Sequence, residues 1–443
     1  MDGSGPVPAS PAPPSVLARV AGHYDCFPYP DARFLVAPCS PEAGWRTLEW
    51  DVGWTAPARF SRELSIWVAG CGTVQATEVA RRYPAARLLA TDLSPVTLEQ
   101  ARRIADAAGV GDRIDFRQHD LSTPLQAAGP FDLIDCVGVL HHLPEPARGL
   151  QTLAAALAPT GVIDLMVYQE GHRRLYLAFR QALALLAPLA AGEPAAARLD
   201  LARRLARDLA GAARCPAWIR TELGRLAELA GERPAWFADT LIHPHEHVYT
   251  PLRLLAEAEA AGLAFAGFTF PAFWDPRLYL QDPALRQRLD ALDLPARAEV
   301  LSLLLADGAP FLELYLAPRA AAPPAPPGPQ LLRQGRVLPH GPWQRTELGP
   351  AGEAVGTSTF GPEPQADGSL KVPGARGASL LPPAAATVLS LVGEGCPVAE
   401  LLTRAAPLAA DRPEAEREPW LLGLVSLLCS PQARLLLFAA AEG

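Results

Sequence analysis

The sequence predicts an α/β protein built around a mostly parallel sheet of seven strands. Between residues 64 and 168, short apolar runs alternate with segments of helical periodicity, as in successive strand–helix–strand units. Glycine or aspartate follows the first three apolar runs, which is typical of strands that end at a ligand-binding edge. Two further apolar runs, at 263–270 and 311–316, complete the predicted sheet.

The elements of this sheet follow one another in a regular order. The first five strands are expected at residues 64–69, 87–91, 113–118, 131–137 and 161–168. Helices are expected between them at residues 77–83, 95–108 and 146–157. Residues 175–229 are rich in alanine, leucine and arginine at helical spacing, so two or three helices are predicted to be inserted before the last two strands.

Changes in composition divide the chain into regions. Residues 1–20 are rich in proline, glycine and serine and are expected to form a disordered leader. The α/β domain is expected at 21–319; it begins with an irregular cap up to residue 60 and includes the helical insertion at about 172–250. A proline-rich stretch at 320–330 predicts a semi-rigid linker. Residues 331–443 are then expected to form a small, mainly helical C-terminal domain.

Composition also argues against several classes of protein. A net charge of −8 without a long basic run disfavours a general nucleic-acid or membrane-surface binder. The seven cysteines include no C-x-x-C pair, which disfavours a disulfide framework and structural zinc and fits a reducing, cytoplasmic location. The start lacks the features of a secretory signal, and no apolar span is long enough for a membrane helix. Nothing in these patterns specifies an oligomeric state.

The first predicted strand runs into Gly70-Cys71-Gly72, and a helix follows. Glycines allow the backbone to turn sharply and to approach a ligand without an intervening Cβ. Backbone N–H groups at the start of the next helix can then face polar ligand atoms. Taken alone, a G-x-G pair is equally compatible with a tight strand–helix turn.

Two aspartates follow the next two strands. Asp92 lies twenty positions after Gly72 and can accept hydrogen bonds from both ribose hydroxyls of a bound nucleoside. Asp120 follows the third strand and can accept a hydrogen bond from an adenine amino group. Either aspartate alone could be a helix N-cap. Three such features at the ends of successive strands, however, lie where open α/β sheets bind their ligands.

Histidines occur in two places that could face the same ligand. The fourth strand ends near Val137 and opens into a loop with His141 and His142, which we expect beside the reactive end of the ligand. The later run His243-Pro-His-Glu-His247 could place three imidazoles on one face of a strand, as a zinc site requires. Because a proline interrupts that run, we expect no metal there and favour a structural or acceptor-facing role.

Together, the segments Gly-Cys-Gly-Thr, Thr-Asp-Leu-Ser and Gly-Val-Leu-His-His-Leu resemble those of class I S-adenosylmethionine (SAM)-dependent methyltransferases, which have a Rossmann-like fold. This resemblance covers about residues 60–170. With Leu143-Pro-Glu-Pro, segments 24–30 and 239–250 resemble more narrowly a bacterial subgroup often joined to tetratricopeptide repeats, up to about residue 318. The resemblance implies SAM as the cofactor, with contacts from Gly70, Cys71, Gly72, Asp92, Leu93, Asp120, Leu121 and Val137.

The sequence departs from the family pattern at two positions. Val68 stands where an acidic residue often helps to order the glycine loop, and Val74 stands where a third glycine is usual. A β-branched residue tolerates a positive φ poorly. The backbone at Val74 is therefore expected to have a negative φ, or else the cofactor is held less closely.

Methyl transfer from a sulfonium is an in-line displacement, to which a protein contributes mainly proximity and orientation. If the acceptor must lose a proton, a base with a pKa near neutrality helps. His141, His142, His243 and His247 could each provide it, and His141 and His243 are taken as the candidate catalytic residues. The acceptor pocket is expected to be lined by six residues: Tyr24, Tyr29, His141, Tyr168, His243 and His247. Such an aromatic pocket with few charges suits a small or medium-sized organic acceptor.

Two other functions share some of these features. A non-catalytic module that binds SAM or its product S-adenosylhomocysteine (SAH) is suggested by Val74. A nicotinamide-dependent oxidoreductase would share Gly-x-Gly and the ribose-binding aspartate. Gln75 occupies the third-glycine position of that dinucleotide fingerprint, and this, together with the Leu-His-His-Leu loop, disfavours the oxidoreductase.

Overall fold

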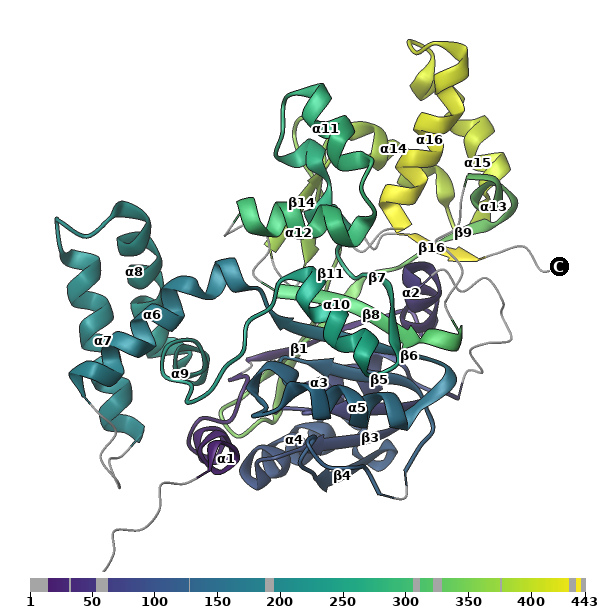
Figure 1. Ribbon diagram of the computed structural model, residues 1–443. Coiled ribbons are helices and arrows are strands. Elements are labelled where there is room, and N and C mark those ends of the chain that lie inside the picture. Colours follow the sequence, from purple (N-terminus) through teal and green to yellow (C-terminus); the bar gives the residue numbers. More distant parts are fainter. Residues whose placement is uncertain are drawn as a thin grey trace, which may run out of the picture.

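A computed structural model describes residues 15–31, 33–52, 63–126, 128–187, 195–305, 311–321, 329–374, 377–429 and 436–439. Its central sheet has seven strands in the order β4-β3-β2-β5-β6-β8-β7. The strands are β2 (Ser65–Ala69), β3 (Arg87–Asp92), β4 (Ile114–Gln118), β5 (Phe131–Val137), β6 (Leu157–Tyr168), β7 (Leu263–Phe268) and β8 (Phe311–Pro318). All are parallel except β8, which runs antiparallel to both neighbours. This confirms the predicted fold class (Figure 1).

Helices cover both faces of the sheet because side chains alternate along each strand. Ile66 and Val68 of β2 face one layer, formed by α2 (Ala43–Val52), α3 (Gln75–Arg82) and α4 (Pro95–Ala107). Trp67 and Ala69 face the other layer, formed by α5 (Pro146–Ala156), α10 (Pro251–Ala260) and α12 (Leu294–Leu304), with α11 (Pro283–Asp290) nearby in sequence. The chain leaves β2 toward β3 on one side and returns on the other side as β5, so a ligand crevice is expected between these strands.

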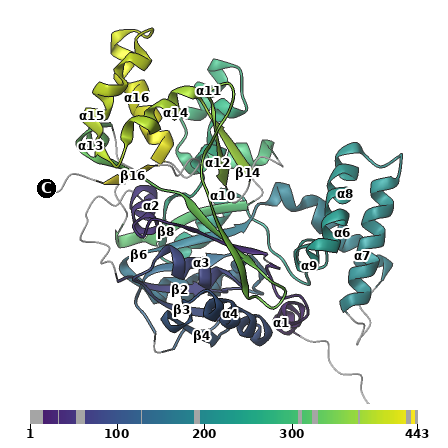
Figure 2. The same cartoon turned by 180° about the vertical axis from the view of Figure 1, so that it is seen from behind.

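The predicted insertion is a helical bundle: three described helices cover residues 175–229, in agreement with the expected two or three, and a fourth helix follows them. These are α6 (Glu170–Leu186), α7 (Ala195–Gly211), α8 (Ala217–Glu232) and α9 (Pro234–Leu241). The bundle has a hydrophobic core of its own, which includes Leu183, Leu226 and Phe237, and it stands to one side of the sheet in both views (Figures 1 and 2). The chain leaves the sheet at the end of β6 and returns beside it, where Gln169 bridges Tyr249.

The expectations for the N-terminal residues are partly wrong. Residues 1–14 of the predicted leader lie outside the described residues, but α1 (Val16–Cys26) already begins at Val16, where the Ser15 side chain caps it. The predicted irregular cap contains most of α1, the strand β1 (Phe34–Pro38) and α2, while residues 53–62 lie outside the described part. The prolines and aromatics of this region gave no sign of β1, a strand whose pairing partner lies far along the chain.

That partner belongs to the C-terminal region. Its predicted helices are present as α14 (Pro383–Val392), α15 (Val398–Ala405) and α16 (Glu414–Cys429), after the short α13 (Pro329–Gln334). This region also forms strands that the sequence did not suggest, most of them in its glycine- and proline-rich part and two, at 396–397 and 436–439, within stretches that were predicted to be helical. They are β9 (Arg336–Pro339), β10 (Trp343–Leu348), β11 (Ala354–Phe360), β12 (Glu363–Pro364), β13 (Leu370–Gly374), β14 (Gly377–Leu381), β15 (Cys396–Pro397) and β16 (Leu436–Ala439).

The C-terminal region has its own core and also contacts the α/β domain. Val388, Leu401 and Val425 are buried in a separate hydrophobic cluster. The hairpin β10–β11 extends from this region across the α/β domain, and β10 pairs antiparallel with β1 (Figure 2). The separate core supports a domain boundary near residues 320–330, which stays a prediction. Among the helices of the described residues, none has the length and apolar character needed to cross a membrane.

Candidate cofactor and acceptor site

The glycine loop joins β2 to α3 at the expected crevice. Gly70 and Gly72 have φ values of +79° and +52°, a backbone region that favours glycine. The N–H groups of Gly70 and Cys71 donate to the Thr91 carbonyl oxygen of β3 at 2.7 and 2.8 Å. A Cβ on Gly70 would lie 2.3 Å from a methyl carbon of Val139, and one on Gly72 would lie 2.6 Å from the Tyr29 carbonyl oxygen. Both positions therefore require glycine for space as well as for conformation.

Val74 does not disturb this loop. Its φ is −128°, a value accessible to any L-residue. Of the two expected alternatives, a negative φ at Val74 or a less closely held cofactor, the first therefore applies. Its side chain is buried against Leu35 and Ile104 instead of facing the crevice. Val68 is likewise buried on the face of the sheet under α3. The backbone reason for suspecting a non-catalytic binding module is thus removed.

Asp92 lies at the end of β3 with its carboxylate turned toward the glycine loop. One oxygen accepts from the Gly72 N–H at 3.0 Å and the other from the Ser94 N–H at 2.9 Å. Burial raises the pKa of Asp92, and these backbone hydrogen bonds oppose that shift. Each carboxylate oxygen can accept more than one hydrogen bond, so the two ribose hydroxyls of a nucleoside could still bind there.

Asp120 also lies where the sequence placed it, directly after β4. One carboxylate oxygen accepts from the Ser122 N–H at 2.8 Å, which closes a local turn. Leu121 is buried in the hydrophobic core, whereas Leu93 and Val137 are half-buried. We call the carboxyl ends of β2, β3 and β4, with Gly70, Gly72, Asp92 and Asp120, the cofactor edge.

The N-terminal segment docks across this edge. The Thr73 N–H donates to the Tyr29 carbonyl oxygen at 3.0 Å, and its hydroxyl donates to the Pro30 carbonyl oxygen at 2.5 Å. The Ser94 hydroxyl donates to Asp25 of α1 at 2.6 Å. These contacts hold α1 and the segment up to Pro30 over the glycine loop, which brings Tyr24 close to the residues that follow β5 and β6.

Six aromatic side chains meet there, and we call them the ring cluster: His23, Tyr24, His141, His142, Tyr168 and His243. The 3₁₀ turn Leu140–His142 after β5 supplies two of the imidazoles. The ring centroids of His142 and His243 lie 3.8 Å apart, those of His141 and Tyr168 lie 4.0 Å apart, and those of Tyr24 and His243 lie 5.4 Å apart. The structure therefore brings together four of the predicted pocket residues.

The other two predicted pocket residues lie at the margin of the cluster. The backbone N–H of His247 donates to the His141 carbonyl oxygen at 2.7 Å, but its ring pairs with His245 outside the cluster, at 3.1 Å between the Nε2 atoms. Burial, followed by the charge of Asp239, raises the pKa of Tyr29. Tyr29 is half-buried near this carboxylate.

Asp239 of α9 was not predicted as a site residue, although it is the first residue of segment 239–250, which carries part of the family resemblance. Only 2% of Asp239 is exposed. Its two carboxylate oxygens accept hydrogen bonds from the hydroxyls of Tyr24 at 3.0 Å and Tyr168 at 2.7 Å. A charged residue near the end of a helix is usually solvated, so its burial follows only from the tertiary structure.

A buried ion-pair network supports the ring cluster from behind. Arg173 of α6 donates two hydrogen bonds to Glu246 at 2.7 and 2.5 Å, and Arg180 also donates to this carboxylate. Burial alone would raise the pKa of Glu246, but the two arginines hold it below its ordinary value. The Arg173 guanidinium also lies 4.0 Å above the ring of Tyr168, which fixes that ring in place.

The imidazoles of the ring cluster are held neutral. Burial lowers the pKa of His23 to about 4 and lowers the pKa values of His141, His142 and His243. Nδ1 of His142 lies 3.0 Å from the His245 carbonyl oxygen. Because a carbonyl oxygen can only accept, Nδ1 carries the proton and Nε2 of His142 keeps a free lone pair.

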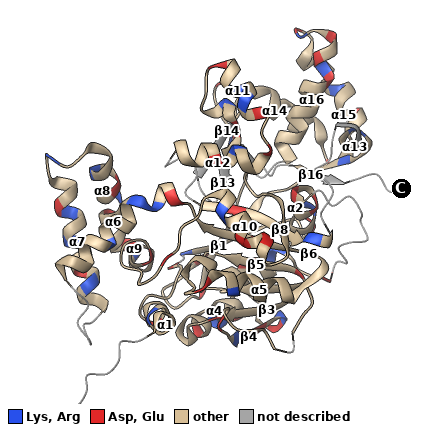
Figure 3. Cartoon of the chain, in the orientation of Figure 1, with Lys and Arg blue, Asp and Glu red and all other residues tan. Residues whose placement is uncertain are grey.

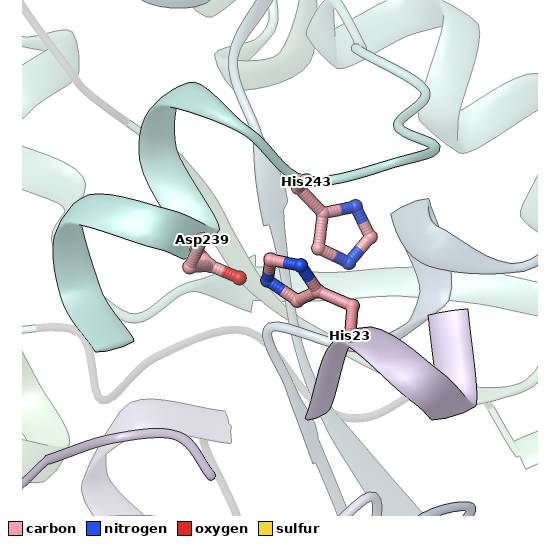
Figure 4. Close-up of side chains that lie close together, drawn as sticks. All are labelled: His23, Asp239 and His243. Carbon is pink, nitrogen blue, oxygen red and sulfur yellow. The ribbon is translucent and has the colours of Figure 1, made fainter. Parts of the chain in front are cut away.

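His243 has the opposite tautomer. Its Nδ1 accepts from the His245 N–H at 3.2 Å, so its proton resides on Nε2. His23, Asp239 and His243 offer three possible metal-ligand atoms within 4.8 Å of one another, and Figure 4 shows their side chains converging. A metal needs a free lone pair on each imidazole, yet one nitrogen of His243 is protonated and the other accepts a hydrogen bond. The donor set therefore fits a metal ion poorly.

Comparisons with known proteins identify relatives of this chain. A family described as "Methyltransferase domain" matches residues 67–163, from β2 into β6. An uncharacterized protein of Synechococcus, syc1184_c, is 34% identical over 303 residues, which cover 66% of this chain and 70% of that protein. A trans-aconitate 2-methyltransferase of Methylobacterium nodulans is 31% identical over 234 residues, or 49% of this chain and 82% of the enzyme.

Solved structures share the fold beyond the matched family segment. PKMT2 from Rickettsia typhi aligns with a TM-score of 0.61 over 91% of this chain and 76% of that protein, at 13% identity. The same protein in complex with AdoHcy aligns with a TM-score of 0.59 over 90% of this chain and 75% of that protein, at 14% identity. The fold of this chain is therefore shared by PKMT2.

Proposed function

The chain belongs to the SAM-dependent methyltransferases, and from this premise we propose that it transfers the methyl group of SAM to a small or medium-sized organic acceptor at the ring cluster. The observation that supports this proposal is the position of the ring cluster beside the cofactor edge. Val139 packs against Gly70, and the imidazoles of His141 and His142 follow directly on the same turn. We also propose that the chain is related to the bacterial subgroup often joined to tetratricopeptide repeats, which segments 24–30 and 239–250 resemble.

SAM is the cofactor of this family, and we propose how this chain holds it. Gly70, Cys71 and Gly72 would line its methionine portion, Asp92 would accept hydrogen bonds from both ribose hydroxyls, and Asp120 with Leu121 would bind the adenine. Leu93 and Val137 would complete the walls. The backbone hydrogen bonds of Asp92 support this arrangement, because they fix the carboxylate before the cofactor arrives.

The ring cluster suits the acceptor side of the reaction. The four histidine rings of the cluster are buried, and these neutral imidazoles, among them the candidates His141 and His243, could accept a proton. Tyr24, Tyr29, Tyr168 and His247 would line or border the acceptor pocket. Along the described ribbon, Lys and Arg positions are interspersed with Asp and Glu positions (Figure 3), which supports a small acceptor over a nucleic acid. The scattered free cysteines support a reducing, cytoplasmic location.

Replacing Asp92 tests the cofactor site. In Asp92→Ala the ribose loses two charge-assisted hydrogen bonds, so SAM and SAH should each bind weaker by a few kcal/mol, about 100-fold in Kd. Isothermal titration calorimetry with SAM, SAH and NAD on the full chain measures this loss. Asp115→Ala, which removes an exposed aspartate of β4, is the matched control. Unchanged SAM affinity in Asp92→Ala would refute the assignment, and SAM binding without turnover of any acceptor class would favour the regulatory module.

A further inference from the structure

Asp239 stands out because it is a buried carboxylate with neutral immediate neighbours. It accepts from two tyrosine hydroxyls, and the Nε2 atom of His142 lies 3.8 Å from one of its oxygens. Arg173 and Arg180 approach the cluster but are both bound to Glu246. Among the residues that the structure describes, no arginine or lysine forms an ion pair with Asp239. A buried carboxylate is stabilised when a cation joins it, so the surroundings of Asp239 are suited to a positively charged group.

The charge change during methyl transfer favours the same class of acceptor. A neutral amine gains positive charge as it attacks the methyl carbon, whereas an alkoxide, phenolate or carboxylate starts with negative charge. Beside Asp239, developing positive charge is stabilised and an anionic nucleophile is repelled. Arg173 and Arg180 together carry one more charge than Glu246 neutralises. This excess positive charge lies behind Tyr168 and is not in direct contact with Asp239.

An alkylamine is protonated near neutral pH, because its pKa is about 10 like that of lysine, and it must lose a proton before it can attack. The free lone pair of His142 Nε2 can accept that proton. A single nitrogen atom can reach both this atom and Asp239, because their separation of 3.8 Å is less than two hydrogen-bond lengths of about 2.9 Å each. The imidazolium that forms would then lie beside the Asp239 carboxylate.

We propose that the acceptor is an amine, that Asp239 binds its ammonium group, and that His142 is the base that removes its proton. This rests on the proposed function and deepens it. One N–H proton moves to Nε2 of His142. The nitrogen then uses the freed lone pair to bond the methyl carbon, the carbon–sulfur bond breaks, and its electron pair stays on sulfur. The products are a methylammonium group and SAH, and His142 later returns its proton to water.

This proposal gives the proton-accepting role to His142 in place of His141 and His243. His243 presents an N–H at Nε2, which cannot accept a proton. Both ring nitrogens of His141 lack a hydrogen-bond partner, so no neighbour fixes its tautomer. His142 alone among the three has a hydrogen bond that directs a lone pair toward Asp239.

Sinefungin provides a probe for this site, because it is a SAM analogue in which a carbon bearing an amino group replaces the methylated sulfur. Its ammonium should lie where the methyl group and the acceptor nitrogen meet, while the rest of the molecule matches SAH. Calorimetry on the full chain gives the Kd of each compound, and their ratio cancels the shared contacts. We expect sinefungin to bind more tightly than SAH, and Asp239→Asn to weaken sinefungin at least ~10-fold while SAH changes less than ~2-fold.

Two further variants make the comparison specific. Glu222→Gln removes another carboxylate of the same insertion, outside the ring cluster, and should leave the ratio of the two Kd values unchanged. Burial lowers the pKa of His142. In the wild type, protonation of His142 at acidic pH should repel the ammonium and lower the preference for sinefungin. His142→Gln should remove that part of the pH dependence. The rest of the pH dependence comes from the other groups that face His142, which are Tyr24, Tyr168, Asp239, His141, His243, Glu246 and Arg180.

Several results would overturn the amine proposal without touching the proposed function. They are equal affinities for sinefungin and SAH, a preference that survives Asp239→Asn, and a pH dependence that survives His142→Gln. Tight binding of Zn²⁺ that is lost in His23→Ala would instead identify a metal centre. If SAH itself fails to bind the wild-type chain, the proposed function fails, so the two failures are distinguishable.

Discussion

The cofactor edge and the ring cluster meet at the same end of the sheet, but they are held by different forces. At the cofactor edge, backbone groups provide the order: N–H groups of Gly72 and Ser94 fix Asp92, and the Thr91 carbonyl fixes the loop. In the ring cluster, side chains from α1, the turn after β5, β6 and the segment after α9 are ordered by the buried carboxylates of Asp239 and Glu246. The first site depends on local sequence, and the second depends on tertiary structure.

Removing a buried charge from the ring-cluster side should therefore have the largest effect on stability. Glu246 is fully buried against Arg173 and Arg180. Glu246→Gln leaves both guanidinium groups without their counter-ion, and we expect the free energy of unfolding to fall by about 3–5 kcal/mol. Urea denaturation followed by circular dichroism measures the loss.

The matched control is Glu222→Gln on the same insertion. Glu222 pairs with Arg225 at the surface, where the two side chains are 25% and 46% exposed. Solvent screens this pair, and the amide oxygen of glutamine can still accept the hydrogen bond that Tyr176 donates to Glu222. The loss of the pair should therefore cost no more than about 1 kcal/mol. Equal losses in the two variants would show that buried charge does not distinguish the ring cluster.

The same contrast explains which parts of the fold the sequence predicted. All seven strands of the central sheet were predicted, because each has its own apolar run and ends at a glycine, an aspartate or a loop. The helix α1 was largely missed because prolines and aromatics surround it. The strand β1 could not be predicted from its neighbours, because it exists as a strand through pairing with β10, near the other end of the chain.

The candidate site divides in the same way. The position of Asp92 beside the glycine loop could be predicted from its order along the chain after Gly70 and Gly72, and the hydrogen bond from the Gly72 N–H agrees with it. Its role in binding a ribose stays a prediction. Tyr24, His141, Tyr168 and His243 were predicted by type and by family likeness, and the structure brings them together. Asp239 and Glu246 were not identified as site residues, because a carboxylate at such a position is normally solvated and only its tyrosine and arginine partners from other elements bury it.

Acid should weaken the ring cluster more than it weakens the cofactor edge. The pKa of His23 is lowered from 6.5 to about 4 in the folded state, so the unfolded chain binds its proton first. The stability from this group is complete above pH 6.5 and is lost as the pH falls toward 4. Between pH 7 and pH 5 the loss should be about 2 kcal/mol.

His23→Gln isolates this contribution, because all other titrating groups are shared with the wild type. The measurement is the difference in unfolding free energy between the two proteins as a function of pH. We expect the wild type to lose about 2 kcal/mol relative to the variant between pH 7 and pH 5. A difference that is independent of pH would mean that His23 is not held neutral among the rings.

The smallest effect is expected at Val74, where the family pattern has glycine. If the cofactor edge depends on backbone conformation alone, glycine offers no advantage here, because φ at Val74 is already −128°. Val74→Gly should therefore change the Kd for SAH by less than ~2-fold, since the valine side chain points away from the crevice into the cluster with Leu35 and Ile104. Calorimetry with SAH on the full chain gives the answer. An affinity gain of tenfold in Val74→Gly would show that the valine holds the loop away from its cofactor, and the cofactor edge would then depend on side-chain packing as the ring cluster does.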